Sequence, residues 1–138
     1  MAMAAPDAAA IVGTWATDDG ASHVAIMAAG DRLDGHVVWL REATFAAGDA
    51  QGMAGQPKVD RNNPDPALRS RPVIGLTVLS GLHYAGNQTW DGGTLYTPAS
   101  GKSYPCKASM ASNGTLKLAV GGSVFGRTIT WTRTAPAN

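Results

Sequence analysis

Short alternating runs of apolar and polar residues recur along most of the chain, and turn residues separate them. In the last of these runs, Ile129 and Trp131 share one face, while Thr128, Thr130 and Thr132 share the other. Alternation with a period of two is typical of a β-strand that buries one face. The pattern predicts strands over 11–16, 22–27, 36–40, 73–80, 84–90, 94–97, 103–110, 116–120 and 127–133.

Glycine-rich turns join these runs. Asn113-Gly114 and Asp91-Gly92-Gly93 predict tight hairpins, and Gly30 and Gly35 predict another between the second and third runs. Short hairpins between successive strands give an antiparallel sheet of about eight or nine strands. Closure into an up-and-down β-barrel would remove its exposed edges, whereas a sandwich of two sheets satisfies the same pattern. The predicted fold class is all-β, with a single antiparallel barrel preferred.

The alternation stops between residues 42 and 72. Glycine and proline break up this stretch, which holds few large apolar residues. The run 63–69 places proline and aspartate where a short helix or a single 3₁₀ turn begins, with Asn63 or Asp65 as its N-cap, and Pro72 ends it. The prediction is one long loop that carries the only helix of the chain.

The length of 138 residues is that of a single domain. We expect a barrel domain over 11–134, a disordered leader or cloning remnant over 1–10, and a tail over 135–138. The first ten residues lack the basic and long apolar regions of a signal peptide. Their alanine-rich composition is typical of a mature end left after processing, which predicts a periplasmic or secreted protein.

Charge and apolar run lengths exclude several classes of function. The formal net charge is +1 and no basic stripe occurs, so nucleic-acid binding is not expected. No apolar run reaches the roughly 18 residues of a membrane-spanning helix. Cys106 is the single cysteine, which excludes an internal disulfide and favours a half-buried strand residue. The oligomeric state does not follow from the sequence.

No residue cluster predicts catalysis, a metal or a cofactor. His23, His36 and His83 follow no metal-ligand spacing, and no serine lies in a nucleophile elbow. The early aspartates flank turns, where capping explains them.

Aromatic side chains with polar tips are candidates for lining a ligand pocket in the barrel. The predicted ligand-binding residues are Trp39, Trp90, Tyr96, Tyr104, His36, Arg69 and Arg71. The two arginines belong to the polar stretch 58–71, which would bind an anionic head group or be held down by its own Asp–Arg contacts.

The first and last strands carry a set of residues that would close one end of a barrel. Gly13 and Trp15, with Arg127 or Arg133, resemble the calycin arrangement, in which an arginine lies over a tryptophan plug. We assign Trp131 to this plug as well. Gly13 permits a bend, Trp15 fills the opening, and a stacked arginine adds about 1 kcal/mol.

Further motifs, in order along the chain, resemble one bacterial family, the domain of unknown function 2147 family. They are Gly13-Thr14-Trp15, Gly35-His36-Val37-Val38-Trp39-Leu40, 60–69, Arg71-Pro72-Val73-Ile74-Gly75, Trp90-Asp91-Gly92-Gly93, 96–106 and 126–133. The resemblance spans 11–133 and implies an exported protein with a lipocalin-like barrel that holds a small apolar ligand.

The leading hypothesis for function is therefore a non-enzymatic protein that binds a small apolar or amphipathic molecule inside the barrel. One alternative is a structural or protein-interaction module of the cell envelope with a filled barrel. The other is a hydrolase or isomerase that uses the barrel cup, which requires two titratable side chains converging there.

Overall fold

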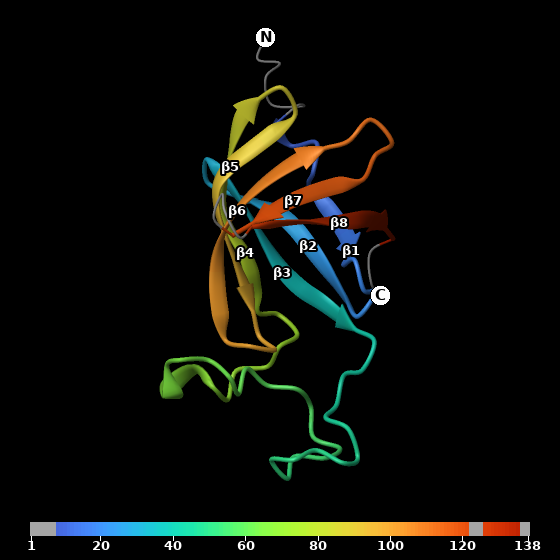
Figure 1. Ribbon diagram of the computed structural model, residues 1–138, viewed down its shortest axis with the longest axis vertical. Coiled ribbons are helices and arrows are strands. Elements are labelled where there is room, and N and C mark those ends of the chain that lie inside the picture. The colour runs from blue at the N-terminus through green and yellow to red at the C-terminus, as the bar shows by residue number, and fades with distance from the viewer. Residues whose placement is uncertain (1–7, 122–125, 136–138) are drawn as a thin grey trace.

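Eight strands follow one another around a closed antiparallel barrel (Figure 1). The computed structural model describes residues 8–121 and 126–135. The elements are β1 (Gly13–Ala16), β2 (Ser22–Ala29), β3 (Arg32–Leu40), the 3₁₀ turn η1 (Pro66–Leu68), β4 (Thr77–Gly86), β5 (Thr89–Thr97), β6 (Lys102–Met110), β7 (Leu116–Val120) and β8 (Arg127–Thr134). The predicted all-β barrel is confirmed, and the two-sheet sandwich is not the fold.

Each strand pairs with its neighbour in sequence, and β1 pairs with β8 to complete the ring. Trp15 lies opposite Arg133 in this closing pair. The Asn113-Gly114 turn joins β6 to β7 as predicted, with Gly114 at a φ of 85° that favours glycine. Closure leaves no unpaired sheet edge among these strands.

The prediction of a hairpin turn at Asp91-Gly92-Gly93 is wrong, because β5 runs straight through it. The β4–β5 turn lies instead at Asn87 and Gln88, which have φ values of 52° and 59°. Gly93 faces the barrel interior, and a Cβ there would lie 2.6 Å from Cδ2 of Leu82. Glycine at this position makes room for a large side chain from the neighbouring strand.

Gly35 has the same role within β3. A Cβ on it would lie 2.9 Å from Cγ1 of Val24, so this glycine is an interior strand residue and does not belong to the hairpin turn predicted around it. The turn between β2 and β3 lies at Gly30, with φ of 68°. Both interior glycines show why glycine alone does not locate a turn.

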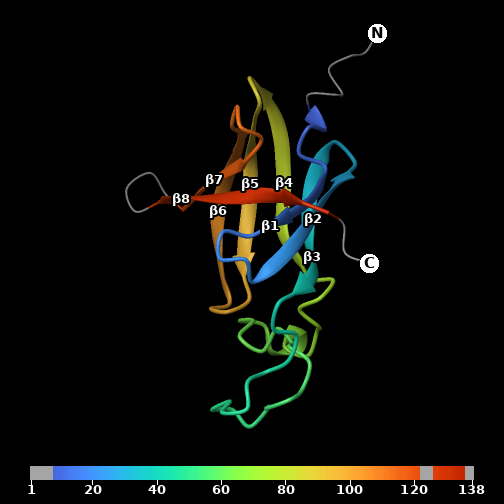
Figure 2. The ribbon, with the colours of Figure 1, turned by 90° about the vertical axis from the view of Figure 1, so that its right-hand side faces the viewer.

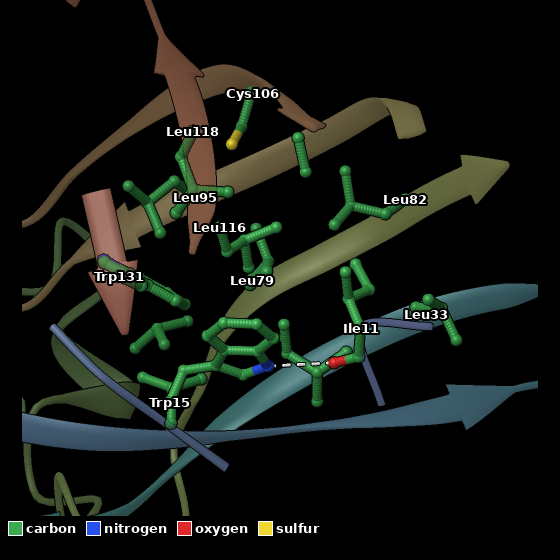
Figure 3. Packing of buried hydrophobic residues seen from close by; sticks show 14 of the residues in the cluster. Ile11, Trp15, Leu33, Leu79, Leu82, Leu95, Cys106, Leu116, Leu118 and Trp131 are labelled. Carbon is green, nitrogen blue, oxygen red and sulfur yellow. Dashed lines mark hydrogen bonds between the residues drawn. The ribbon is translucent and has the colours of Figure 1, made fainter. Parts of the chain in front are cut away.

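The interior of the barrel is packed with aliphatic and tryptophan side chains. The side chains of Trp15, Trp90, Leu79, Leu82 and Leu116 have no measurable exposure or nearly none. Figure 3 shows part of this cluster, with contributions from strands all around the barrel. Tight packing of this kind gives the fold most of its stability.

The segment before β1 packs onto the barrel as well. Trp90 Nε1 donates to the carbonyl oxygen of Ala8 at 2.9 Å, and Trp15 Nε1 donates to that of Ile11 at 2.9 Å (Figure 3). Arg133 donates to the carbonyl oxygen of Ala10 at 2.8 Å. Residues 8–10, predicted as part of a disordered leader, therefore contact the barrel. The rest of that leader, 1–7, and the end of the tail, 136–138, lie outside the described residues.

The long segment 41–76 extends beyond one end of the barrel, as the two perpendicular views show (Figures 1 and 2). Its helix is the predicted single 3₁₀ turn, and Asp65 is the N-cap that accepts a hydrogen bond from the Ala67 backbone at 3.0 Å. Two isolated bridges, Thr44 with Pro57 and Val59 with Pro72, tie the segment to itself. In the described residues, no helix is long and apolar enough to cross a membrane.

Candidate ligand-binding site

A cavity of about 640 Å³ opens at the end of the barrel from which the long segment emerges. Its inner wall is apolar and comes from five strands. The wall residues are Val24, Val37, Val78, Leu95, Ile129 and Trp131. A volume of this size is within the range of small-molecule sites.

The distribution of side-chain sizes explains why the cavity lies at this end. Three of the wall positions hold valine, whereas the opposite half of the interior is filled by leucines such as Leu33 and Leu82 together with Trp90. Shorter side chains at the same barrel radius leave space that larger ones would occupy. The barrel is thus packed at one end and cup-shaped at the other.

Acidic and basic side chains surround the mouth of this cup in equal numbers. The acidic ones are Asp18, Asp19, Glu42 and Asp49, and the basic ones are Arg41, Lys58, Arg61 and Arg127. The formal charges of the mouth therefore cancel. Lys58 is half-buried, whereas Glu42 and Arg127 are exposed.

One ion pair orders the outer part of the long segment. Arg61 donates to Asp49 through both terminal nitrogens, at 2.7 and 2.9 Å, and its guanidinium carbon lies 3.9 Å from the ring centre of Phe45. The Arg61 guanidinium, helped by the backbone N–H of Met53, lowers the pKa of Asp49 to about 2. A forked ion pair of this geometry, stacked on an aromatic ring, fixes the segment beside the mouth.

A buried carboxylate anchors the inner part of the segment. Asp60 has no exposed surface, and its oxygens accept from Tyr96 Oη at 2.6 Å and from Asn63 Nδ2 at 2.8 Å. Arg71 Nη2 lies 3.5 Å from the same carboxylate. Burial and the hydrogen bond to Asp60 raise the pKa of Tyr96 to about 12. Since Tyr96 also lines the cup, this anchor joins the segment directly to the wall.

A third contact connects the segment to the β5–β6 turn. Asn62 Nδ2 donates to the carbonyl oxygens of Pro98 and Ala99, at 3.3 and 2.9 Å. The backbone of Asn62 lies so close to Gly101 that a Cβ at Gly101 would overlap its carbonyl oxygen. Gly101 also has a φ of 72°, so both space and backbone conformation require glycine here.

A family model for an uncharacterized protein conserved in bacteria, DUF2147, matches residues 13–133 of the chain. The chain belongs to this family. A solved structure that is similar to this DUF2147 chain is described as "Protein HP1028 from the human pathogen Helicobacter pylori belongs to the lipocalin family". The two share 26% identity with a TM-score of 0.73, over 91% of this chain and 83% of that one. No protein with a curated description matches the chain.

Of the seven predicted ligand-binding residues, only Tyr96 lines the cup of this DUF2147 chain. Trp39 instead is exposed and stacks on His23, with 4.3 Å between ring centres. The physical reason is a bulge: Val24 pairs with Val37 and His23 with Trp39, which leaves Val38 without a partner. One extra residue reverses the inward–outward alternation, so Trp39 turns away from the interior.

The other two aromatic candidates are not among the residues that line the cup. Trp90 is fully buried in the core, and Tyr104 is half-buried and packs against it. His36 lies between the inward-facing residues Gly35 and Val37, so it is on the outer face of β3. None of these three residues lines the cup.

Both arginine candidates hold the long segment instead of lining the cup. Arg69 Nε donates to the carbonyl oxygen of Asn63 at 2.7 Å, and Arg71 contacts the Asp60 carboxylate. The contact of Arg71 with Asp60 agrees with the second prediction for residues 58–71, in which the stretch is held down by its own Asp–Arg contacts. The basic side chains at the mouth are instead those of Arg41, Lys58, Arg61 and Arg127.

Three of the residues predicted to close the barrel of this DUF2147 chain, Gly13, Trp15 and Arg133, contact one another. The guanidinium carbon of Arg133 lies 4.3 Å from the ring centre of Trp15, and Gly13 has a φ of 139° with a Cβ position only 2.5 Å from Arg133 Nη1. Trp131 and Arg127 are among the residues that line the cup, and Trp131 lies two residues along β8 from Arg133, the partner of Trp15. Of the two candidate arginines, Arg133 is the one over Trp15.

The described residues of the cup combine an apolar wall with a charged mouth. Within 8–121 and 126–135, no group of three or more histidine, cysteine or acidic side chains is placed to hold a metal ion. The carboxylates of the cup lie at its mouth, and the wall holds aliphatic side chains. Cys106 is buried, and burial raises the pKa of its thiol to about 11, which disfavours the nucleophilic thiolate.

Several residues that shape the site carry no recognisable pattern in the sequence. Phe45 and Asp49 lie in a stretch without periodicity, and their contact with Arg61 joins positions up to 16 apart in number, 45 to 61. The valines of the cup wall follow the same apolar–polar alternation as the other strand residues. The sequence pattern therefore does not distinguish residues that line the cup from residues of the packed core. Comparing side-chain volumes between the two ends of each strand would have indicated where the space lies.

Proposed function

We propose that this chain is a non-enzymatic binding protein that holds a small apolar or amphipathic molecule in the cup. The cavity of about 640 Å³ with its aliphatic wall is the observation that carries the proposal. Burial of an apolar ligand there releases water from both surfaces, which is favourable by about 25 cal/mol per Å² of apolar area. The balanced charges of the mouth suit a polar group at the ligand's outer end.

The anchored segment supports this proposal. The contacts of Asp60, Arg61 and Asn62 hold residues 41–76 at one side of the mouth, where Phe45 and Val59 extend the apolar lining. A prearranged site loses less conformational entropy when a ligand enters. The similar HP1028 structure is described as a member of the lipocalin family, and a lipocalin-like barrel is compatible with this proposal.

Binding of a fluorescent probe in the cup, measured by its fluorescence, tests the proposal. 8-Anilinonaphthalene-1-sulfonate carries an apolar ring system and one charged group, and we expect one molecule to bind per barrel. Ile129→Trp narrows the cup and should weaken binding about tenfold, equivalent to ~1.4 kcal/mol. Thr128→Trp adds the same bulk on the exposed outer face of β8 and is the matched control.

Equal binding to the wild type and both variants would place the probe outside the cup and count against the proposal. Absence of binding to folded wild type would do so as well, and would favour the envelope interaction module. Circular dichroism and the urea midpoint of each variant establish that loss of binding is not loss of fold.

We also propose a periplasmic or secreted location. Membership of the bacterial DUF2147 family, for which the sequence resemblance implies exported proteins, supports it. Fractionation of the native host with an antibody against this protein tests the location: signal in the periplasmic or medium fraction is expected, and signal confined to the cytoplasmic fraction would contradict it.

A further inference from the structure

Lys58 lies in a short three-stranded arrangement that the long segment forms beside the cup. Two isolated antiparallel bridges place it between 43–45 and 71–73. The backbone N–H of Lys58 donates to the carbonyl oxygen of Ala43 at 2.9 Å, and its own carbonyl oxygen accepts from the N–H of Val73 at 3.0 Å. Hydrogen bonds on both sides therefore fix the backbone at Lys58.

This pairing directs the Lys58 side chain towards the cup. Residues directly opposite each other in an antiparallel pair share a face, so Lys58 shares one with Ala43 and Val73. Alternation adds Phe45, two residues beyond Ala43, to the same face. Phe45 and Val73 are buried and line the cup. Since Lys58 also lines the cup, its side chain lies between these two apolar residues.

The ammonium of Lys58 differs from the neighbouring cations of the mouth in having no partner. Arg61 forms the forked ion pair with Asp49, and Arg41 donates to the backbone carbonyl oxygen of Asp19 at 3.3 Å. No ion pair joins Lys58 to a carboxylate within the part of the chain that the structure describes, and its Nζ makes no hydrogen bond there. Lys58 is nevertheless half-buried.

A ligand group can reach this ammonium. Among the described residues, the buried side-chain nitrogen without a partner is that of Trp131, so the unpartnered Nζ of Lys58 retains accessible surface. The nearby Asp60 carboxylate is enclosed and already accepts from Tyr96 and Asn63. A half-buried ammonium loses part of its hydration, and a carboxylate beside it offsets this loss through a charge-assisted hydrogen bond.

We propose that the ligand of the cup is an amphipathic carboxylic acid, whose carboxylate pairs with the Lys58 ammonium while its apolar body lies against the aliphatic wall. This inference rests on the proposed binding function and names the polar group of the ligand. Arg127 also lies at the mouth, but it is exposed and water hydrates its charge. Pairing with an anion therefore relieves a larger loss of hydration at Lys58 than at Arg127.

Two probes with the same alkyl chain test the role of the charge. Octanoate carries a carboxylate where 1-octanol carries a hydroxyl. Titration into methyl-labelled protein follows the signals of Val37 and Val78 in the cup, and a ¹³C label at the carboxyl carbon of octanoate reports the pKa of the bound probe. Lys58→Met removes the ammonium and Lys58→Arg keeps a cation. Lys107→Met, on the exposed outer face of β6, changes the net charge equally and is the matched control.

We expect Lys58→Met to raise the dissociation constant of octanoate about tenfold relative to that of 1-octanol, as for loss of one charge-assisted hydrogen bond. Lys58→Arg and Lys107→Met should leave this ratio within about twofold of the wild type. The pKa of octanoate bound to the wild type should lie below that of free octanoate. A neighbouring ammonium favours the charged carboxylate, whereas burial alone favours the neutral acid.

The outcomes separate the two proposals. If neither probe moves the methyl signals of Val37 and Val78, the cup does not bind such molecules and the proposed function fails. If both probes move these signals while the affinity ratio is the same in Lys58→Met and the wild type, the cup binds without pairing at Lys58, and the inference alone is overturned. An unchanged or raised pKa of octanoate in the wild type overturns it as well, even if Lys58→Met does not fold.

Discussion

Removing the hydroxyl of Tyr96 tests whether the buried Asp60 carboxylate anchors the long segment. Tyr96→Phe deletes the 2.6 Å hydrogen bond and keeps the ring that lines the cup. A hydrogen bond to a charged group contributes about 1.5–3 kcal/mol, and Asp60 is completely buried, so we expect a loss of about 2–3 kcal/mol. For a chain of this length that lowers Tm by roughly 6–15 °C.

Urea unfolding followed by tryptophan fluorescence measures this loss. Tyr104→Phe is the matched control, because Tyr104 lies opposite Leu95 on the neighbouring strand and its hydroxyl forms no hydrogen bond within the described part of the chain. Its unfolding free energy should change by less than about 0.5 kcal/mol. A loss below about 0.5 kcal/mol for Tyr96→Phe would refute the reasoning, as would an equal loss in both variants.

The same anchor has a pH signature. The folded-state pKa of Tyr96 is raised to about 12 from the ordinary value of 10.0, so the folded state favours the protonated phenol. Its contribution to stability is complete below pH 10 and is lost as the pH rises from 10 to about 12. The wild type should therefore lose stability more steeply than Tyr96→Phe over that range, and parallel curves would contradict the assignment.

Further predictions concern the closed end, the mouth and the cysteine. Trp15→Ala should cost about 3–5 kcal/mol in denaturant melts, because it removes a buried side chain and the surface on which Arg133 stacks; a loss below about 1 kcal/mol would contradict this. The pKa of Asp49 is lowered to about 2, so its ion pair with Arg61 stabilises the fold above pH 4 and is lost towards pH 2. Asp49→Asn should flatten this part of the stability–pH curve, and an unchanged slope would speak against it. Cys106 should react with a thiol reagent at pH 8 only as the protein unfolds, and rapid labelling of folded protein would show that it is accessible.

Much of the barrel could be predicted from local pattern. Alternation located most strands, and Asn113-Gly114 identified the β6–β7 hairpin because a tight turn of this type requires positive φ. The same reasoning wrongly predicted a turn at Gly92-Gly93, which lies inside β5. Gly93 lies inside a strand and makes room for the side chain of Leu82 on the neighbouring strand. In the sequence it cannot be distinguished from a turn glycine, because only the packing of the two strands separates the two cases.

The site was harder to predict than the fold, for two physical reasons. A single bulge at Val38 reversed the direction of Trp39, and no residue type marks such a bulge in the sequence. The segment 41–76 is held by contacts between distant positions, such as Asp60 with Tyr96, which leave no periodic trace. Placing Trp131 required knowing which end of the barrel holds the smaller side chains.

The central claim is that the cup holds a small molecule, and native mass spectrometry of protein purified from its own host tests it most directly. The account predicts a bound mass on the wild type that organic extraction releases, that is retained in Thr128→Trp and that is absent from Ile129→Trp. A clean mass for the unliganded chain in all three, or a bound mass that persists in Ile129→Trp, would contradict it.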